Sequence, residues 1–198
     1  MAQERANIVE SVKNSIVGSI KGTGEIANAV VDTVSSTIVN TIRGTGAVGT
    51  ALTSTVSDVL RGAIQGTRHV GGDVRDAAKG GVIGVLRGTK EMGVEATETI
   101  STSARAVVKG AAEVGGDVGS AAKSAVEGAI AGAKEIGLNA ESAASAAASG
   151  AIKGAGEISS TAVEQVRDAV TGVISGVKVV VTEPFRKGEG KKNDRKAS

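Results

Sequence analysis

The stretch AIAGAKEI at residues 129–136 is followed by AIKGAGEI at residues 151–158, a close copy placed 22 residues later. Six further copies, five before this pair and one after it, align with it without a gap. Their central glycines are Gly22, Gly44, Gly66, Gly88, Gly110, Gly132, Gly154 and Gly176. Such a constant period is typical of a repeat architecture in which each copy is one structural unit.

The repeat length predicts helix, because 22 residues fit six turns at about 3.67 residues per turn, close to the α-helical 3.6. On such a helix, small residues form the centre of one face, aliphatic columns flank them, and Lys, Arg and Glu lie opposite. We expect the aliphatic columns to face a lipid or a protein partner, and the eight central glycines to permit close packing. The column residues are Ile20, Ile26, Ile42, Val48, Ile64, Val70, Leu86, Met92, Val108, Val114, Ile130, Ile136, Ile152, Ile158, Ile174 and Val180.

Six in-phase GxxxG pairs strengthen the expectation of regular helix contacts, because this spacing lets two helices approach closely. The pairs are Gly18/Gly22, Gly62/Gly66, Gly84/Gly88, Gly128/Gly132, Gly150/Gly154 and Gly172/Gly176. A β-solenoid is the alternative, since Val, Ile and Thr favour strands. It would turn charged residues of the same parity inward. These are Asp32, Arg68, Lys90, Lys134 and Glu164.

The repeat length never varies, which favours one extended rod over a series of hairpins, because loops tolerate insertions. The rod would hinge into helical hairpins at glycine clusters such as Gly71–Gly72, or Gly44, Gly46 and Gly49. The predicted fold is all-α, with a helical repeat region at residues 1–182 and a disordered, flexible basic tail at 183–198. Pro184 stands at the boundary, and the residue before a proline disfavours helix.

The composition argues against catalysis. The chain has 29 glycines, one aromatic residue, no cysteine and one histidine, His69, for which we expect an exposed position. We therefore expect no catalytic residues, no metal and no cofactor. Gly44–Gly49 matches the GxGxxG string of dinucleotide-binding turns, but the same residues belong to one repeat unit. Glu91, Glu95 and Glu98 would share one helix face and could bind a divalent ion weakly, although a solvated charged face is the commoner explanation.

Charge is uneven along the chain. Residues 186–198 hold six basic and two acidic residues, whereas the chain as a whole has 23 and 21. The body has neither a basic stripe nor interleaved aromatics, so nucleic-acid binding is not expected. No apolar run approaches the roughly 20 residues of a membrane-spanning helix. Glycine costs about 1 kcal/mol relative to alanine inside a helix, so the rod needs another helix or an apolar surface to stabilise it.

The strings Gly88-Thr-Lys-Glu-Met-Gly-Val94 and Gly132-Ala-Lys-Glu-Ile-Gly-Leu138 resemble the 11-residue repeats of synucleins. The wider periodicity is similar to that of perilipins and exchangeable apolipoproteins. This resemblance implies a protein that becomes helical on lipid droplets, vesicles or lipoproteins.

Two functions follow from this pattern. The first is a non-enzymatic protein, cytoplasmic and peripheral to a membrane or inclusion, whose amphipathic helix coats or scaffolds a lipid or other apolar surface. The alternative is self-association into a structural rod or filament, a right-handed hendecad coiled coil without a lipid ligand. Small residues at the centre of the face favour this alternative, because lipid insertion gains more from bulky side chains.

Overall fold

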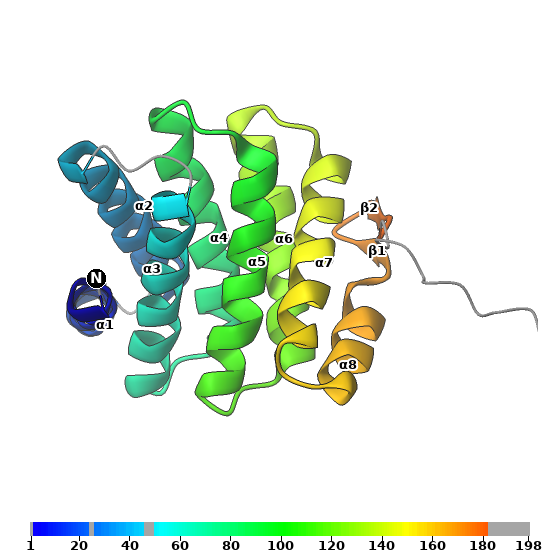
Figure 1. The fold of residues 1–198 in the computed structure, drawn as a ribbon, viewed down its shortest axis with the longest axis horizontal. Helices are drawn as coiled ribbons and strands as arrows, with labels where there is room; N and C mark the ends of the chain where they lie inside the picture. Colours follow the sequence, from blue (N-terminus) through cyan, green and yellow to red (C-terminus); the bar gives the residue numbers. More distant parts are fainter. Residues whose placement is uncertain (1, 24–25, 46–49, 182–198) are drawn as a thin grey trace, which may run out of the picture.

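The computed structural model describes residues 2–23, 26–45 and 50–181, which are almost entirely helical (Figure 1). The all-α prediction is confirmed at this level, but the chain is not one long helix. Two short strands, β1 (Gly172–Ile174) and β2 (Val177–Val179), follow the last helix. The helices are α1 (Ala2–Thr23), α2 (Ile26–Thr45), α3 (Thr50–His69), α4 (Val74–Glu91), α5 (Ala96–Glu113), α6 (Val118–Ile136), α7 (Ala140–Gly156) and α8 (Ser160–Val170).

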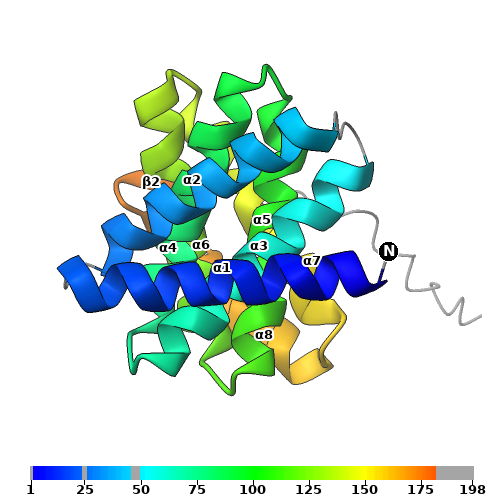
Figure 2. The ribbon, with the colours of Figure 1, turned by 90° about the vertical axis from the view of Figure 1, so that its left-hand side faces the viewer.

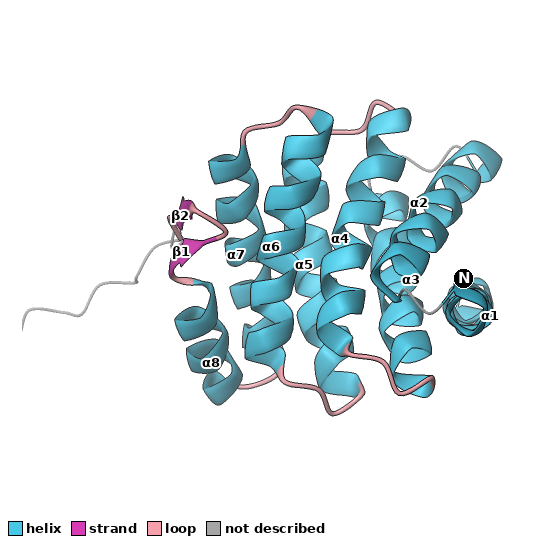
Figure 3. Ribbon diagram, turned by 180° about the vertical axis from the view of Figure 1, so that it is seen from behind, coloured by secondary structure: helices cyan, strands magenta, loops and turns pink. Residues whose placement is uncertain are grey.

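The helices form two layers, because each helix makes its largest contact with a helix two places away along the chain, either before or after it. Helices α1, α3, α5 and α7 make one layer, and α2, α4, α6 and α8 make the other (Figures 1 and 3). Figure 2 shows α1 and α2 at the N-terminal end of this array. The core of the array is aliphatic, and Ile16, Ile38, Leu60, Leu86 and Ile130 are almost completely buried in it. Of these five residues, Leu86 and Ile130 belong to the predicted columns.

Four of the helices end at a second set of glycines, which recur with the same period as the central ones. Gly71, Gly93, Gly115 and Gly137 have φ angles of 75°, 67°, 69° and 78°, in the left-handed region that favours glycine. In each turn the next residue donates its backbone N–H to a carbonyl five residues back, as from Gly116 to Ala111 at 2.8 Å. This is the Schellman arrangement, which satisfies the last carbonyls of a helix.

A polar N-cap follows two residues after three of these glycines and starts the next helix. Asp117 Oδ1 accepts from the N–H of Ser120 at 2.6 Å, and Asn139 Oδ1 accepts from the N–H of Ser142 at 2.8 Å. Asp73 Oδ1 likewise accepts from the N–H of Arg75 at 2.8 Å. Each of these turns therefore ends one helix at its glycine and starts the next helix at the N-cap two residues later.

The extended rod was the wrong interpretation of the constant repeat length. The constant repeat length agrees with turns of one construction, because the N-cap position follows the left-handed glycine by two residues in each turn from α3 to α7. The hinge predicted at Gly71–Gly72 is confirmed as the α3–α4 turn. Gly46 and Gly49 lie outside the described residues, as do Pro184 and the tail predicted at 183–198.

The last repeat does not stay helical. Its residues Ile174, Gly176 and Val180 are in phase with the earlier units, but the run after Val170 is rich in valine and isoleucine, which favour strands. Ser175 and Gly176 have φ angles of 49° and 79°, the two positive values that a type I′ hairpin turn needs. Strand propensity and the turn dipeptide therefore override the helical period here.

Candidate functional site

The most regular feature of the described residues is the contact between neighbouring helices of one layer, made through glycine. A Cβ on Gly62 would lie 2.6 Å from the Val9 carbonyl oxygen of α1, and one on Gly84 would lie 2.6 Å from that of Val31 in α2. At Gly150 a Cβ would overlap the Ser101 carbonyl oxygen of α5 even more closely. Any side chain at these positions would separate the two backbones.

Four of the six GxxxG pairs lie against a neighbouring helix in this way: Gly62/Gly66, Gly84/Gly88, Gly128/Gly132 and Gly150/Gly154. Gly18 and Gly44 have nothing within 4 Å of the position that a Cβ would take. Of the central glycines, Gly110 faces the Ile64 side chain, and Gly176 lies in the hairpin turn. Gly22 is helical, but its surroundings are outside what the structure describes.

The register of these contacts changes by one helical turn along the array. Gly62 and Gly128 occupy the same position of the repeat, but they meet different positions of their neighbours. Gly62 faces Val9, whereas Gly128 faces Lys79, which lies one helical turn later in its repeat than Val9 does. The α2/α4 pair has the register of α1/α3, and the α5/α7 pair has that of α4/α6.

Two ion pairs on the outer faces of the layers each join residues 48 positions apart. Arg87 Nε of α4 is 2.8 Å from Glu135 Oε2 of α6, and Lys109 Nζ of α5 is 2.7 Å from Glu157 Oε2 of α7. Both pairs use the same two positions of the repeat. Arg105 also pairs with Glu157. The polar face predicted from the repeats therefore includes cross-links between helices of one layer.

Two of the carboxyl groups that accept hydrogen bonds from basic side chains, Glu157 and Asp73, have lowered pKa values. The hydrogen bond from Lys109, with the charges of Arg105 and Lys109, lowers the pKa of Glu157 from its usual value near 4.5. At the start of α4, hydrogen bonds from the Arg75 side chain and backbone lower the pKa of Asp73. Both groups hold structure together as carboxylates, and neither has the raised pKa that a general acid needs.

The predicted partner-facing residues mostly lie within the fold. Those that are buried pack against neighbouring helices or the hairpin: Ile42, Ile64, Leu86, Val108, Ile130 and Ile174. Those that are partly buried lie mostly near helix ends: Ile26, Val70, Met92, Val114, Ile136 and Ile152. Ile158 and Val180 are exposed. Val48 lies outside the described residues, and the side chain of Ile20 is also not described.

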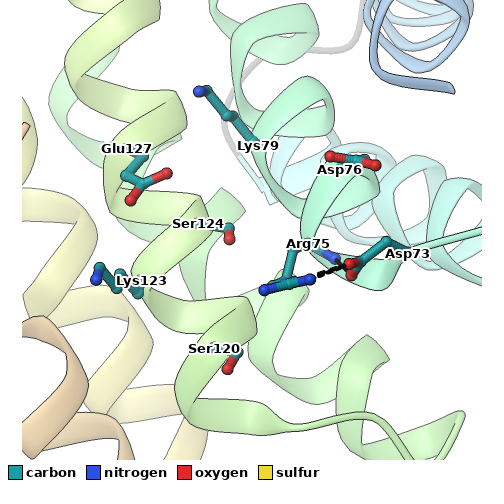
Figure 4. A pocket seen from close by; sticks show the side chains of 8 residues that line it. All are labelled: Asp73, Arg75, Asp76, Lys79, Ser120, Lys123, Ser124 and Glu127. Carbon is teal, nitrogen blue, oxygen red and sulfur yellow. Dashed lines mark hydrogen bonds and ion pairs between the residues drawn. The ribbon is translucent and has the colours of Figure 1, made fainter. Parts of the chain in front are cut away.

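Two grooves of the described surface are lined by both acidic and basic side chains. One of about 370 Å³ runs between α4 and α6 (Figure 4). Its lining residues are Asp73, Arg75, Asp76, Lys79, Ser120, Lys123, Ser124 and Glu127. The Arg75 guanidinium is already bonded to the Asp73 carboxylate, with Nε 2.8 Å from Oδ2. No nucleophile in this groove is paired with a base, so its geometry suggests no chemistry.

Other candidate residues are not brought together. Glu91 ends α4, Glu95 is the N-cap residue of α5, and Glu98 lies in the first turn of α5, so the three do not share one helix face. The three carboxylates are therefore not arranged as the possible divalent-ion site would require. His69 is exposed at the end of α3, as predicted.

The C-terminal end presents the most exposed aliphatic side chains among the residues described. Val173 has 72% of its surface exposed and Val180 has 58%. Val173 is directly opposite Lys178 in the hairpin, whereas Ile174, Val177 and Val179 turn inward and are buried. Val173, Lys178 and Val180 together are called the hairpin outer face below.

Sequence reasoning missed two features for which a signal exists. The turn glycines and the N-cap positions 73, 95, 117 and 139 both recur with the period of the repeat, in a Gly-X-Asp, Asn or Glu pattern that marks a helix end followed by a helix start. The hairpin is signalled by Ser175-Gly176 between two valine-rich runs.

No protein-family model matches this chain, and no curated protein matches its sequence. Within residues 2–23, 26–45 and 50–181, no helix is both long and apolar enough to span a bilayer. The same residues contain no group of three or more histidine and acidic side chains placed to hold a metal ion.

Proposed function

We propose that this protein is a non-enzymatic helical-repeat scaffold, whose repeated apolar face packs within the chain and whose outer faces present paired charges. The observation that carries this proposal is the glycine contact between helices of one layer. The contacts are made at Gly62, Gly84, Gly128 and Gly150. Glycine is needed at such positions only where another backbone comes so close that a Cβ would clash with it.

A helix that adsorbs on a lipid surface does not need glycine at these positions. Adsorbed helices gain free energy from the apolar area that they bury, and glycine contributes almost none. In the packed array, the same positions shorten the distance between helices and let the columns of Val and Ile interlock. The glycine content therefore favours a scaffold that is folded without lipid over a coat that becomes helical only on lipid.

Circular dichroism and sedimentation velocity of the purified chain in buffer test this proposal. We expect high helicity and one cooperative thermal transition, because the layers share a continuous core. We also expect helicity to stay constant when vesicles or an oil emulsion are added. A chain that is disordered in buffer and gains helix only with lipid would contradict the scaffold and support the coat.

Self-assembly into filaments is the second structural possibility, and the polar surface at the N-terminal end weighs against it. The exposed residues of α1 and α2 include Asn7, Glu10, Asn14, Asp32 and Asn40, which make a polar outer surface at the N-terminal end. Terminal units of repeat proteins are polar where the array stops. A chain that sediments as a monomer over a wide concentration range would agree with the scaffold, whereas helical filaments in buffer would favour self-assembly.

A further inference from the structure

The contact between α2 and α4 repeats itself at every helical turn. Three glycines of α4, spaced four residues apart, face backbone carbonyl groups of α2: Gly80 faces Ala27, Gly84 faces Val31, and Gly88 faces Ser35. Among the described helices, α4 is the one with three glycines at this spacing. Four residues are close to one turn of helix, so a shift of α2 by one turn would bring the carbonyls of Val31, Ser35 and Val39 to the same glycines.

The side chains of α2 that pack on α4 have the same spacing. The Cβ atoms of Val34 and Ile38 are 2.9 and 3.1 Å from the positions that a Cβ would take on Gly84 and Gly88. Ile42 continues this row by one further turn and is also buried. A one-turn shift would therefore replace one aliphatic side chain by another at each contact, a kind of exchange that cores tolerate well.

The register that such a shift would produce already occurs in the next pair of the same layer. Gly128 of α6 occupies the position of the repeat that Gly84 has in α4. It faces Lys79, which lies one helical turn later in its repeat than Val31, the residue that faces Gly84. Both registers are therefore ways in which helices of this repeat pack.

An ion pair is characteristic of the second register. In the α4/α6 pair, Arg87 Nε is 2.8 Å from Glu135 Oε2. Arg43 of α2 and Glu91 of α4 occupy the same two positions of the repeat, and both are exposed. Within the described part of the chain, neither has an ion-pair partner. A one-turn shift of α2 would bring Arg43 and Glu91 together as Arg87 and Glu135 are.

The observed register has an attraction of its own between α2 and α4. The hydrogen bond to Glu135 raises the pKa of Arg87, and the charge of Asp32 on α2 raises it further. Asp32 thus lies close enough to Arg87 to act on it. In the second register α2 would lie one turn nearer to the N-terminal end of α4, which would carry Asp32 away from Arg87. Each register therefore has one favourable charge contact that the other lacks.

We propose that α2 has two registers on α4, one helical turn apart, and that the contacts Asp32–Arg87 and Arg43–Glu91 decide between them. The displacement is one helical pitch, about 5.4 Å. Shifts of one element past another by a whole turn are one form of two-state switch, because packed interfaces accept discrete positions and no intermediate ones. A partner that binds Arg43 would hold the observed register, because it would occupy the cation that the second register needs.

This switch goes beyond the scaffold role and makes the N-terminal end of the array adjustable. It changes the position of a helix and not the amount of helix. The scaffold proposal is tested by helicity in buffer, whereas the switch is tested by distances within the folded chain. A chain with one fixed register would leave the scaffold proposal unaffected.

Distances between two spin labels on the full chain test the switch. The chain has no cysteine, so labels can be attached at Asn40→Cys on α2 and Lys123→Cys on α6, two exposed positions. Double electron–electron resonance should give two distances, of which the shorter belongs to the second register. The difference should be up to about 5 Å, because the shift carries Asn40 toward the N-terminal end of α6, where Lys123 lies. The control pair Lys90→Cys/Lys123→Cys joins α4 to α6 and should give one distance.

Charge variants of the labelled protein test what sets the balance. Asp32→Asn should raise the share of the shorter distance, and Glu91→Gln should lower it. Exposed ion pairs are weak, so we expect each variant to change the ratio of the two distances by roughly 1.5- to fivefold. The matched control is Glu113→Gln, which alters the position of α5 that corresponds to Glu91 and should leave the ratio unchanged.

Three results would overturn the proposal. The first is a single distance between the labels on α2 and α6, both in the otherwise unchanged protein and in Asp32→Asn. The second is a pair of distances whose ratio responds to neither Asp32→Asn nor Glu91→Gln. The third is a pair of distances for the α4/α6 control labels as well, which would assign the movement to α6. Circular dichroism of each labelled variant verifies that the helices are retained.

Discussion

Gly150→Ala is the sharpest test of the packing, because the added methyl would face backbone that cannot move aside. Its Cβ would overlap the Ser101 carbonyl oxygen and would lie 2.7 Å from the Ser101 carbonyl carbon and 2.8 Å from its Cα. Ordinary van der Waals contact begins at 3.4 Å, so all three atoms are too close. Helices α5 and α7, which share one of the largest interfaces of the array, would have to move apart.

The expected size of this effect combines two opposed contributions. Alanine gains about 1 kcal/mol over glycine from helix propensity. Overpacking in a well-packed interior costs roughly 1–3 kcal/mol and occasionally more. Because the clash is with backbone, we take the upper end of that range, and we expect the free energy of unfolding to fall by about 2 kcal/mol.

Gly44→Ala is the matched control, since Gly44 is helical and exposed, and its Cβ position has nothing within 4 Å. Here only the helix propensity acts, so we expect stabilisation by roughly 0.5–1 kcal/mol. Urea denaturation followed by far-ultraviolet circular dichroism would measure both variants. If Gly150→Ala proves as stabilising as Gly44→Ala, the close approach of α5 and α7 is wrong.

Five further substitutions test three other features of the array by the same denaturation measurement. Thr67 is fully buried and its hydroxyl has no hydrogen-bond partner, so Thr67→Val should raise the free energy of unfolding by about 1 kcal/mol. Thr89→Val is the control: it loses a 2.8 Å hydrogen bond to the Val85 carbonyl and should not stabilise the protein. Asp117→Ala removes a helix cap and should destabilise by about 1 kcal/mol, while Glu95→Asp supplies a cap where the structure has no side-chain cap bond and should stabilise. Glu157 has a lowered pKa in the folded state, so its contribution to stability is present above pH 4.5 and is lost as the pH falls through the pKa of the folded state. Glu157→Gln should therefore lower the free energy of unfolding by less than about 1 kcal/mol at neutral pH. In this variant stability should also fall less steeply as the pH becomes acidic. An equally steep fall in this variant, a destabilised Thr67→Val or a neutral Asp117→Ala would each contradict its reasoning.

Helix and part of the close contacts could be predicted from the sequence. Gly66, Gly88, Gly132 and Gly154 lie against a neighbouring helix, whereas Gly44 has nothing within 4 Å of its Cβ position and Gly176 lies in the hairpin turn. Both predictions depend on residues within one repeat, such as Ile64 and Gly66, whose close spacing and regular recurrence place them on a helix. The breaks between helices were also encoded, by Gly115 and Asp117 and their equivalents. Constant spacing does not imply a continuous helix, because a turn of fixed length preserves the period equally well.

The arrangement of the helices could not be predicted in the same way. Nothing within a single repeat indicates that α4 packs beside α2 and α6, because every unit carries the same face and could meet any other. The contact made by Gly128 is shifted by one helical turn relative to that made by Gly84, and this shift depends on how whole helices pack against each other. The hairpin outer face was missed for a different reason, since a helical period assigned to Ile174 and Val180 hid their strand propensity.

The alternation of helices between two layers sets a rule for how such a chain can change in length. One added repeat unit would place the hairpin after a helix of the opposite layer, where Ile174, Val177 and Val179 would no longer meet the surface that they cover. Two added units would restore the layer and keep the glycines opposite a neighbouring backbone. Gene duplication or design should therefore lengthen this protein in steps of two helices, and natural variants with an odd number of additional units would need a different terminus.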